Sequence, residues 1–296
     1  MRLFYCDHIP IPLPRGHKFP AEKYSLVRRL LAVDTRFTFE PAPPASPADI
    51  RLAHDPDYVD AFLSGALDPR AMRRIGFPWS EPLVRRTLAS VGGTLAAARD
   101  ALATGFGGNL AGGTHHAFYG EGSGFCVFND LAVAIRTLRR RAAVIDLDVH
   151  QGDGTAAIFE GDDNVFTVSL HGANNFPFRK RRSRIDIALP DGTGDEQYLD
   201  CLAAVLPQVA AFRPEIVFYQ SGVDALAGDR LGRLRLSPAG LAARDRMVFI
   251  ATKEWRIPIV VTLGGGYASP ISLTAEAHAV TFRTAATVFT LQLFVS

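Results

Sequence analysis

Short apolar runs alternate with longer segments of helical periodicity along this chain of 296 residues. Seven runs have the length and apolar character of strands, and they span residues 3–5, 108–110, 143–147, 165–170, 185–189, 216–219 and 259–263. Helical periodicity is found near residues 22–32, 80–104, 129–140, 195–211, 237–254 and 272–292. Because strands separated by helices form parallel sheets with both faces covered, the pattern predicts an α/β fold with a parallel sheet.

A proline-rich segment at residues 41–47 interrupts this alternation. Such a segment is typical of a domain boundary, and it is also typical of a surface loop that caps the following helix. We favour the loop, because an N-terminal domain of about 40 residues would hold a poor hydrophobic core. We therefore expect one domain over residues 1–296.

Polar clusters follow the carboxyl ends of five predicted strands. In chain order they are Gly112-Gly113-Thr114-His115-His116, Asp146-Leu147-Asp148-Val149-His150, Ser169-Leu170-His171, Gln220-Ser221-Gly222-Val223-Asp224 and Leu263-Gly264-Gly265-Gly266-Tyr267. In open α/β sheets this edge is where functional sites form. Five clusters at one edge therefore predict a site there.

Asp146, Asp148 and His150 fall at a spacing of two residues. In a strand this spacing puts them on one face, where burial is costly unless their charge is compensated. A metal ion is the usual compensation, and zinc accepts carboxylate oxygen and imidazole nitrogen. Asp148 and His150 are therefore candidate ligands. The natural third ligand is Asp224, in a glycine-flanked loop that follows another apolar strand.

A site with two metal ions is the main alternative at this edge. It would need a second carboxylate close to Asp224, in an Asp-x-Asp arrangement. Position 226 is leucine, and the next acid is Asp229. This spacing favours one transition metal over a manganese pair.

His115 and His116 are candidates for general acid–base work, because imidazole titrates near neutral pH. Each would need a carboxylate that fixes its tautomer, and Asp146 and Asp153 are the available residues. Asp153 is also typical of a helix N-cap, and the two roles can coexist. Tyr267 follows three glycines that let the backbone approach a ligand closely, so its hydroxyl is a candidate for stabilising an oxyanion.

Three further features bear on the site, and two of them allow two interpretations. Phe125 and Phe176 either line a narrow apolar channel or belong to the core. Asp146 and Ser169, together with backbone carbonyls, form a candidate site for a monovalent cation. The basic run at residues 179–184 is typical of a solvated loop, and it would also attract an acidic partner at the rim of the site.

Composition excludes several classes of protein. The 32 basic and 30 acidic residues leave a net charge of +2, which argues against nucleic acid as a partner. Three cysteines without a C-x-x-C pair, and an N-terminus unlike a signal peptide, predict a cytoplasmic location. No charge-free run reaches the length of about 18 apolar residues that a membrane span needs. The apolar stretch at 272–295 carries Glu276, His278 and Arg283, so we expect a docking helix there and not a membrane anchor.

Taken in order, these motifs resemble those of the zinc-dependent histone deacetylase superfamily. The similarity includes the clusters above, the sequence Gly124-Phe125-Cys126-Val127-Phe128-Asn129-Asp130, and the continuation Gln151-Gly152-Asp153-Gly154. The motifs are long and collinear, and the match covers most of residues 108–290. The short chain and the order Asp-Leu-Asp-Val-His-Gln are most similar to the class IV branch and its bacterial relatives.

The resemblance implies an arginase–deacetylase fold with a central eight-stranded parallel sheet, present as a catalytic domain over residues 1–296. It implies that Asp148, His150 and Asp224 bind zinc, with ferrous iron as the alternative that this ligand set accepts. A structural potassium ion would involve Asp146 and Ser169.

The resemblance also implies roles for the remaining site residues. His116, paired with Asp153, would act as general base and then as general acid, while His115, paired with Asp146, would act electrostatically. Tyr267 would polarise the acyl carbonyl. The lysine channel would be lined by Phe125, Phe176, Gly124 and Gly265.

Three positions differ from many members of the superfamily. Only three glycines precede Tyr267, Gln151 stands where many relatives have a second histidine, and Asp153 stands where class IV proteins carry asparagine. These differences leave the proposed ligand set intact, and they loosen the assignment to a subclass and to an acyl-chain length.

The sequence therefore predicts a metal-dependent amidohydrolase that uses metal-activated water and a histidine base. It would remove an acetyl or longer fatty acyl group from the ε-amine of lysine in a protein or peptide, or from an acylated small amine. A binuclear manganese hydrolase and a non-catalytic acyl-lysine binder are the alternatives. We expect no direct binding of nucleic acid and no membrane span. The oligomeric state is open, and a monomer is favoured.

Overall fold

The computed structural model describes residues 1–290. Eight parallel strands form one sheet in the order β2-β1-β3-β8-β7-β4-β5-β6. The strands are β1 Arg2–Tyr5, β2 Thr38–Pro41, β3 Phe106–Asn109, β4 Ala142–Asp146, β5 Val165–Gly172, β6 Ile185–Leu189, β7 Ile216–Gln220 and β8 Ile259–Thr262. Every residue of β3, β4, β7 and β8 is buried, as expected for strands covered on both faces.

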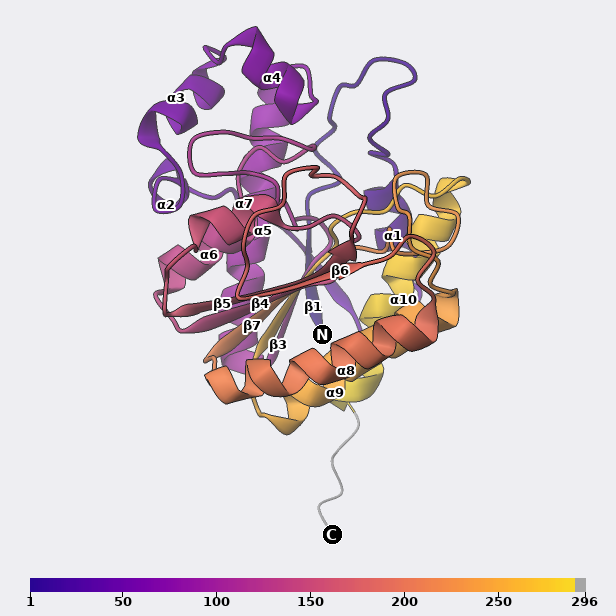
Figure 1. Cartoon of the computed structure of the whole chain (residues 1–296). Coiled ribbons are helices and arrows are strands. Elements are labelled where there is room, and N and C mark those ends of the chain that lie inside the picture. The colour runs from indigo at the N-terminus through magenta and orange to yellow at the C-terminus, as the bar shows by residue number, and fades with distance from the viewer. Residues whose placement is uncertain (291–296) are drawn as a thin grey trace.

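Helices cover both faces of the sheet (Figure 1). One layer contains α1 Lys23–Leu31, α8 Asp195–Phe212, α9 Pro238–Glu254 and α10 Ile271–Thr290, and the other contains α5 Glu81–Thr104, α6 Asp130–Leu138 and α7 Asp153–Ile158. The short helices α2 Pro47–Ile50, α3 Pro56–Ser64 and α4 Pro69–Ile75 lie beyond the sheet, beside the second layer. No helix within residues 1–290 is long and apolar enough to cross a membrane.

The predicted α/β fold and its eight-stranded sheet are confirmed. The docking helix is also confirmed, because α10 packs against α1 and α9; residues 291–295 of the predicted stretch lie outside the described residues. Strand β2 is the one that the apolar pattern does not predict. It is short, mostly exposed and at the sheet edge, where Pro41 needs no partner for its nitrogen.

The proline-rich segment packs as a surface loop. The amide of Ala45 donates to the carbonyl of Leu88 at 2.9 Å, and Ser46 then caps α2 by accepting from the amide of Asp49 at 3.1 Å. A Cβ at Gly92 of α5 would lie 1.9 Å from the carbonyl oxygen of Pro43. The segment is therefore held directly on α5.

The carboxyl ends of the central strands lie side by side. In the register of the sheet, Asp146 pairs with Ser169 on one side and with Gln220 on the other, and Gln220 pairs with Thr262. The loops that follow these strands therefore meet at one edge, as predicted from the polar clusters.

Candidate active site

Three predicted metal ligands converge after β4 and β7. One donor atom each from Asp148, His150 and Asp224 lies within 4.8 Å of the other two. Nδ1 of His150 lies 3.0 Å from Oδ1 of Asp148 and 3.1 Å from Oδ2 of Asp224. The other oxygens are held by backbone amides, since Gly265 donates to Asp148 at 2.7 Å and Val149 donates to Asp224 at 2.8 Å.

The electrostatics of this group fit a cation. Both carboxylates are buried, and burial together with the charge of Asp148 raises the pKa of Asp224 to about 7. Burial lowers the pKa of His150, but hydrogen bonds to the two carboxylates outweigh this effect and raise it to about 10. A metal ion at this position would offset the mutual repulsion of the carboxylates. Two carboxylates and one imidazole are also a donor set that zinc or ferrous iron accepts.

Glycines make room for the carboxylates. A Cβ at Gly265 would lie 2.0 Å from Oδ2 of Asp224 and 2.7 Å from Oδ2 of Asp148. A Cβ at Gly222 would lie 2.2 Å from the same oxygen of Asp148. The backbones of both loops thus approach the ligand atoms more closely than any side chain would allow.

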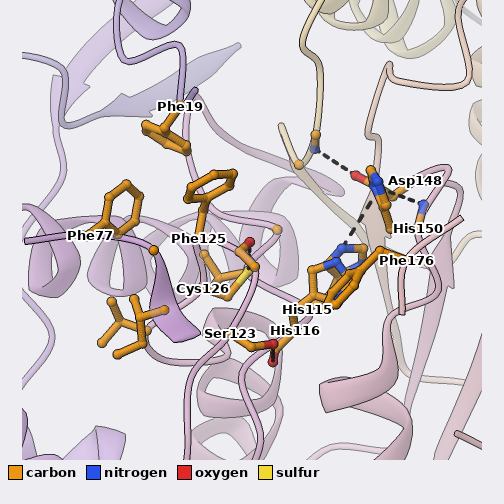
Figure 2. Close-up of a pocket in the computed structure, with 18 of the residues that line it drawn as sticks. Phe19, Phe77, His115, His116, Ser123, Phe125, Cys126, Asp148, His150 and Phe176 are labelled. Atoms are coloured by element: carbon orange, nitrogen blue, oxygen red, sulfur yellow. Dashed lines mark hydrogen bonds and ion pairs between the residues drawn. The ribbon is translucent and has the colours of Figure 1, made fainter. Parts of the chain in front are cut away.

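Each histidine of the His115–His116 pair has its own carboxylate. Nδ1 of His115 lies 2.6 Å from Oδ2 of Asp146, and Nδ1 of His116 lies 2.6 Å from Oδ1 of Asp153. The centroids of the two imidazole rings are 4.1 Å apart, and Figure 2 shows both rings facing Asp148 and His150. All four side chains of the two pairs are buried.

The two histidines differ in their protonation. Burial lowers the pKa of His115, but the charges of Asp146 and Asp148 outweigh it and raise this pKa to about 9. Burial and the neighbouring His115 charge lower the pKa of His116 to about 4, and Asp153 only partly offsets them. His115 is therefore the cationic member of the pair, and His116 is the neutral member with a free basic nitrogen.

Tyr267 lies in the loop after β8 and is nearly buried. Its amide donates to Oδ2 of Asp229 at 2.6 Å, and its carbonyl accepts from Nε of Arg230 at 2.9 Å. Burial and the charges of Asp224 and Asp148 raise the pKa of Tyr267 well above its usual range. The phenol therefore stays protonated and able to donate a hydrogen bond.

The site opens into a cavity of about 590 Å³ lined by all four predicted channel residues, Gly124, Phe125, Phe176 and Gly265. The Phe176 ring lies 5.0 Å from that of His116. Phe125 adopts a φ of 65°, rare for an aromatic residue, and its ring meets that of Tyr267 at 6.3 Å. At Gly124, a Cβ would lie 2.8 Å from the His116 ring.

Two more phenylalanines extend the apolar wall of this cavity. Phe19 and Phe77 lie 5.3 and 5.5 Å from Phe125 between ring centroids, at the end of the cavity away from the histidines (Figure 2). Both lie in segments without a catalytic motif, so sequence pattern offers no signal for them.

The residues of the predicted potassium site are neighbours in the sheet. Asp146 and Ser169 are paired across β4 and β5, and the Ser169 hydroxyl lies 3.0 Å from Nδ1 of His171. Oδ1 of Asp146 accepts from the amide of Asp148 at 3.2 Å, while its other oxygen contacts His115. Potassium binding at these residues stays a prediction.

Gln220 is a site residue that pattern reasoning does not single out. It is fully buried, donates from Nε2 to Oδ2 of Asp148 at 3.0 Å, and accepts from the amide of Gly222 at 2.7 Å. Its signal is present in the sequence, because it is a polar residue at the end of an apolar strand, in register with Asp146.

Asp130 and Lys23 support the site from further away. Buried Asp130 accepts from the amides of Gly113 and Thr114 at 3.1 and 2.7 Å, which holds the loop that carries the histidine pair. Nζ of Lys23 donates to the carbonyl of Gly264 at 2.8 Å, and burial lowers the pKa of this lysine to about 8. Asp130 is the last residue of the motif that begins at Gly124, although sequence pattern gives it no role, and Lys23 has no sequence signal.

Comparison with known proteins gives consistent matches. The histone deacetylase domain model matches residues 17–283. An uncharacterized protein of Picosynechococcus sp. is 44% identical over 97% of this chain and 98% of its own length. Histone deacetylase 2 of Arabidopsis thaliana is 33% identical over 85% of this chain and 70% of its own length.

Two solved structures share the fold. They are the HD domain of HDA15 and an acetylpolyamine aminohydrolase from Burkholderia pseudomallei, each with a TM-score of 0.80 and 98% coverage of this chain. The matches cover 90% and 98% of those chains, at 22% and 20% sequence identity.

Proposed function

This chain belongs to the histone deacetylase family, and we propose that it is a metal-dependent amidohydrolase acting on acyl-lysine or a related acylated amine. The acyl group would be acetyl or a longer fatty acyl chain. The observation that carries the proposal is the convergence of the candidate metal ligands, both histidine–carboxylate pairs and Tyr267 at one cavity.

Asp148, His150 and Asp224 would hold the metal, either zinc or ferrous iron. When bound, such an ion lowers the pKa of water and polarises a carbonyl oxygen. His116 would take a proton from the attacking water at Nε2, because its Nδ1 is already bonded to Asp153. The same nitrogen would return the proton to the leaving amine.

Two other side chains would stabilise charge on the substrate. Tyr267 would donate its hydroxyl hydrogen to the acyl oxygen as negative charge develops there, which its raised pKa permits. His115 would remain protonated beside Asp146 and contribute positive charge. Tyr267 and the histidine pair line the cavity together with Phe125 and Phe176, which would enclose the aliphatic part of the lysine.

The alternatives predict different sites. Among residues 1–290, Asp148, His150 and Asp224 are the only group with this ligand geometry, which supports one catalytic metal rather than a manganese pair. A non-catalytic acyl-lysine binder would not need both histidine–carboxylate pairs and Tyr267. The class IV assignment, potassium, a cytoplasmic location, a monomeric state and one catalytic domain over residues 1–296 stay predictions.

The decisive experiment combines metal analysis with an activity assay. We expect about one zinc or iron per chain, and hydrolysis of lysine peptides that carry acyl groups from acetyl to myristoyl. The matched control is Asp224→Ala, which should lose both the metal and the activity. Two manganese ions per chain would contradict the proposal, and so would a metal-loaded protein that hydrolyses no acyl-lysine or acyl-polyamine substrate.

A further inference from the structure

The charged residues that line the cavity are almost all basic. Lys23, Arg73, Arg74, Arg86 and Arg233 line it, whereas Asp148, a candidate metal ligand, is the single carboxylate among the lining residues described. Lys23 and Arg86 are buried, while the other three arginines belong to the exposed rim. Because the whole chain has nearly equal numbers of basic and acidic residues, this excess is local.

The loop at residues 176–184 adds to the charge of the rim. It contains five basic residues and no acid. Arg179 and Arg182 are exposed, and neither has a carboxylate partner within residues 1–290. Phe178 is 86% exposed and lines the cavity. The loop therefore presents an aromatic ring at the entrance, and the unpaired, exposed Arg179 directly follows it.

Contacts with the active site hold this loop in place. Gln151 directly follows the candidate ligand His150, and its side chain accepts from the amide of Arg181 at 2.8 Å and donates to the Arg181 carbonyl at 2.6 Å. Rings then lead outward from the site, since Phe176 lies 5.0 Å from His116 and 6.4 Å from Phe178. Gln151 thus fixes the backbone of the basic loop, and Phe176 and Phe178 connect that loop to the cavity.

The opposite rim has the same sign. Arg73 and Arg74 form the last turn of α4. Arg74 pairs with Glu121, and Arg73 has no carboxylate partner in the described part of the chain. The carbonyl of Gly76, just after α4, lies 2.9 Å from Nε2 of His17, which brings the exposed Lys18 to this side. A substrate would therefore meet positive charge on both sides of the entrance.

We propose that the substrate presents its acyl-lysine within an acidic protein segment, whose carboxylates contact Arg179, directly after the cavity residue Phe178, on one rim and Arg73 on the other. This inference rests on the proposed function, which it makes more specific. An acetylated polyamine keeps other ammonium groups, and a lysine-rich segment carries many, so the rim repels both. Attraction across an exposed rim acts mainly on encounter and selectivity, and it weakens with salt.

The test compares three acetyl-lysine peptides that differ only in their flanks, which are aspartate, serine or lysine, together with an acetylated polyamine. Both kcat/KM and binding by fluorescence anisotropy are measured with the metal-loaded full chain. We expect the aspartate peptide to exceed the lysine peptide on the order of tenfold at low salt, with the ratio falling at high salt.

Charge-reversal variants locate the effect. The double variant Arg73→Glu, Arg179→Glu should bring the ratio close to one or invert it. The control is Arg99→Glu, because Arg99 is exposed near the end of α5 that precedes β3, at the opposite edge of the sheet. It should behave like the wild-type protein. Melting temperatures verify that each variant is folded.

The outcomes separate the two proposals. Hydrolysis with no preference, or with a preference for the lysine flanks or the polyamine, would overturn the acidic-segment inference and leave the deacylase proposal standing. Selective binding of the aspartate peptide without any hydrolysis would support the inference and contradict the deacylase proposal. Absence of both binding and hydrolysis would overturn both.

Discussion

Nδ1 of His116 lies 2.6 Å from Oδ1 of Asp153, and both side chains are buried. The contact keeps the imidazole in one orientation and leaves Nε2 as its basic nitrogen. Asp153 is itself fixed at the start of α7, where its Oδ1 also accepts from the amide of Gly154 at 3.0 Å.

This pair predicts a graded loss of activity. Asp153→Ala removes the acceptor of Nδ1, so kcat should fall by about tenfold or more, while Asp153→Asn keeps an acceptor oxygen and should retain more activity. His116→Ala should be at least as damaging, and adding Asp153→Ala to it should cost little more. Steady-state kinetics on an acetyl-lysine peptide measure the series. Normal turnover in Asp153→Ala would show that His116 does not need this partner.

Tyr267 should act on turnover and not on metal binding. Tyr267→Phe removes only the hydroxyl, so kcat should fall by a factor of about 10² to 10³ while the metal content stays unchanged. The control is Tyr119→Phe, because Tyr119 is 54% exposed and does not line the cavity. Activity and metal analysis on the same preparations decide, and an active Tyr267→Phe variant would rule out the assigned role.

Gly265 should control metal affinity. In Gly265→Ala the new methyl group would lie 2.0 Å from Oδ2 of Asp224, so the ligands must shift, and affinity should fall by about tenfold to a hundredfold. Gly194→Ala is the matched control, because nothing lies within 4 Å of a Cβ there. Competition with a chelator measures the affinity. Equal metal affinities for the two variants would show that the structure accommodates the new methyl group without displacing the metal ligands.

His54 should make stability depend on pH. It is fully buried between the Phe118 carbonyl and the Asn129 amide, and burial lowers its pKa from 6.5 to about 4. Below pH 6.5 the unfolded chain binds a proton at His54 that the folded chain does not bind. The free energy of unfolding therefore decreases as pH falls from 6.5 to 4, by up to roughly 3 kcal/mol from this group.

The measurement is urea unfolding of the wild-type protein and of His54→Gln across this pH range. The wild-type protein should be the more stable of the two near pH 7, and its advantage should shrink as the pH is lowered. A difference that stays constant from pH 7 to pH 4 would show that His54 contributes no linkage.

Arg244 should be essential for stability. It is fully buried, pairs with Asp245, and donates to the carbonyl of Gly222 at 2.7 Å and to that of Leu147 at 3.2 Å. Arg244→Met leaves the buried carboxylate of Asp245 without its cationic partner and should lower the free energy of unfolding by about 3–5 kcal/mol. Exposed Arg246→Met should change it little. Similar denaturation midpoints for both variants would contradict this role.

Sequence pattern is enough to predict the sheet and the edge at which the site lies. Continuous apolar runs identify the doubly covered strands, and polar residues directly after them must lie at the carboxyl edge, because parallel strands end on the same side. Short edge elements such as β2 lack this signal. So does α4, which lies in a long stretch without a catalytic motif but carries part of the cavity wall.

Some features depend on the tertiary structure alone. The residue types alone allow either aspartate, Asp146 or Asp153, to pair with either histidine. The fold pairs His115 with Asp146, 31 positions away in the sequence, and His116 with Asp153, 37 positions away. The fold likewise places Gln151 under the basic loop and Gln220 beside Asp148. Local pattern encodes which face a side chain takes, whereas contacts between separate elements depend on strand register and on how the loops pack. Motif order therefore identifies the chemistry of the site, and packing decides the partners of each group and the charge around its entrance.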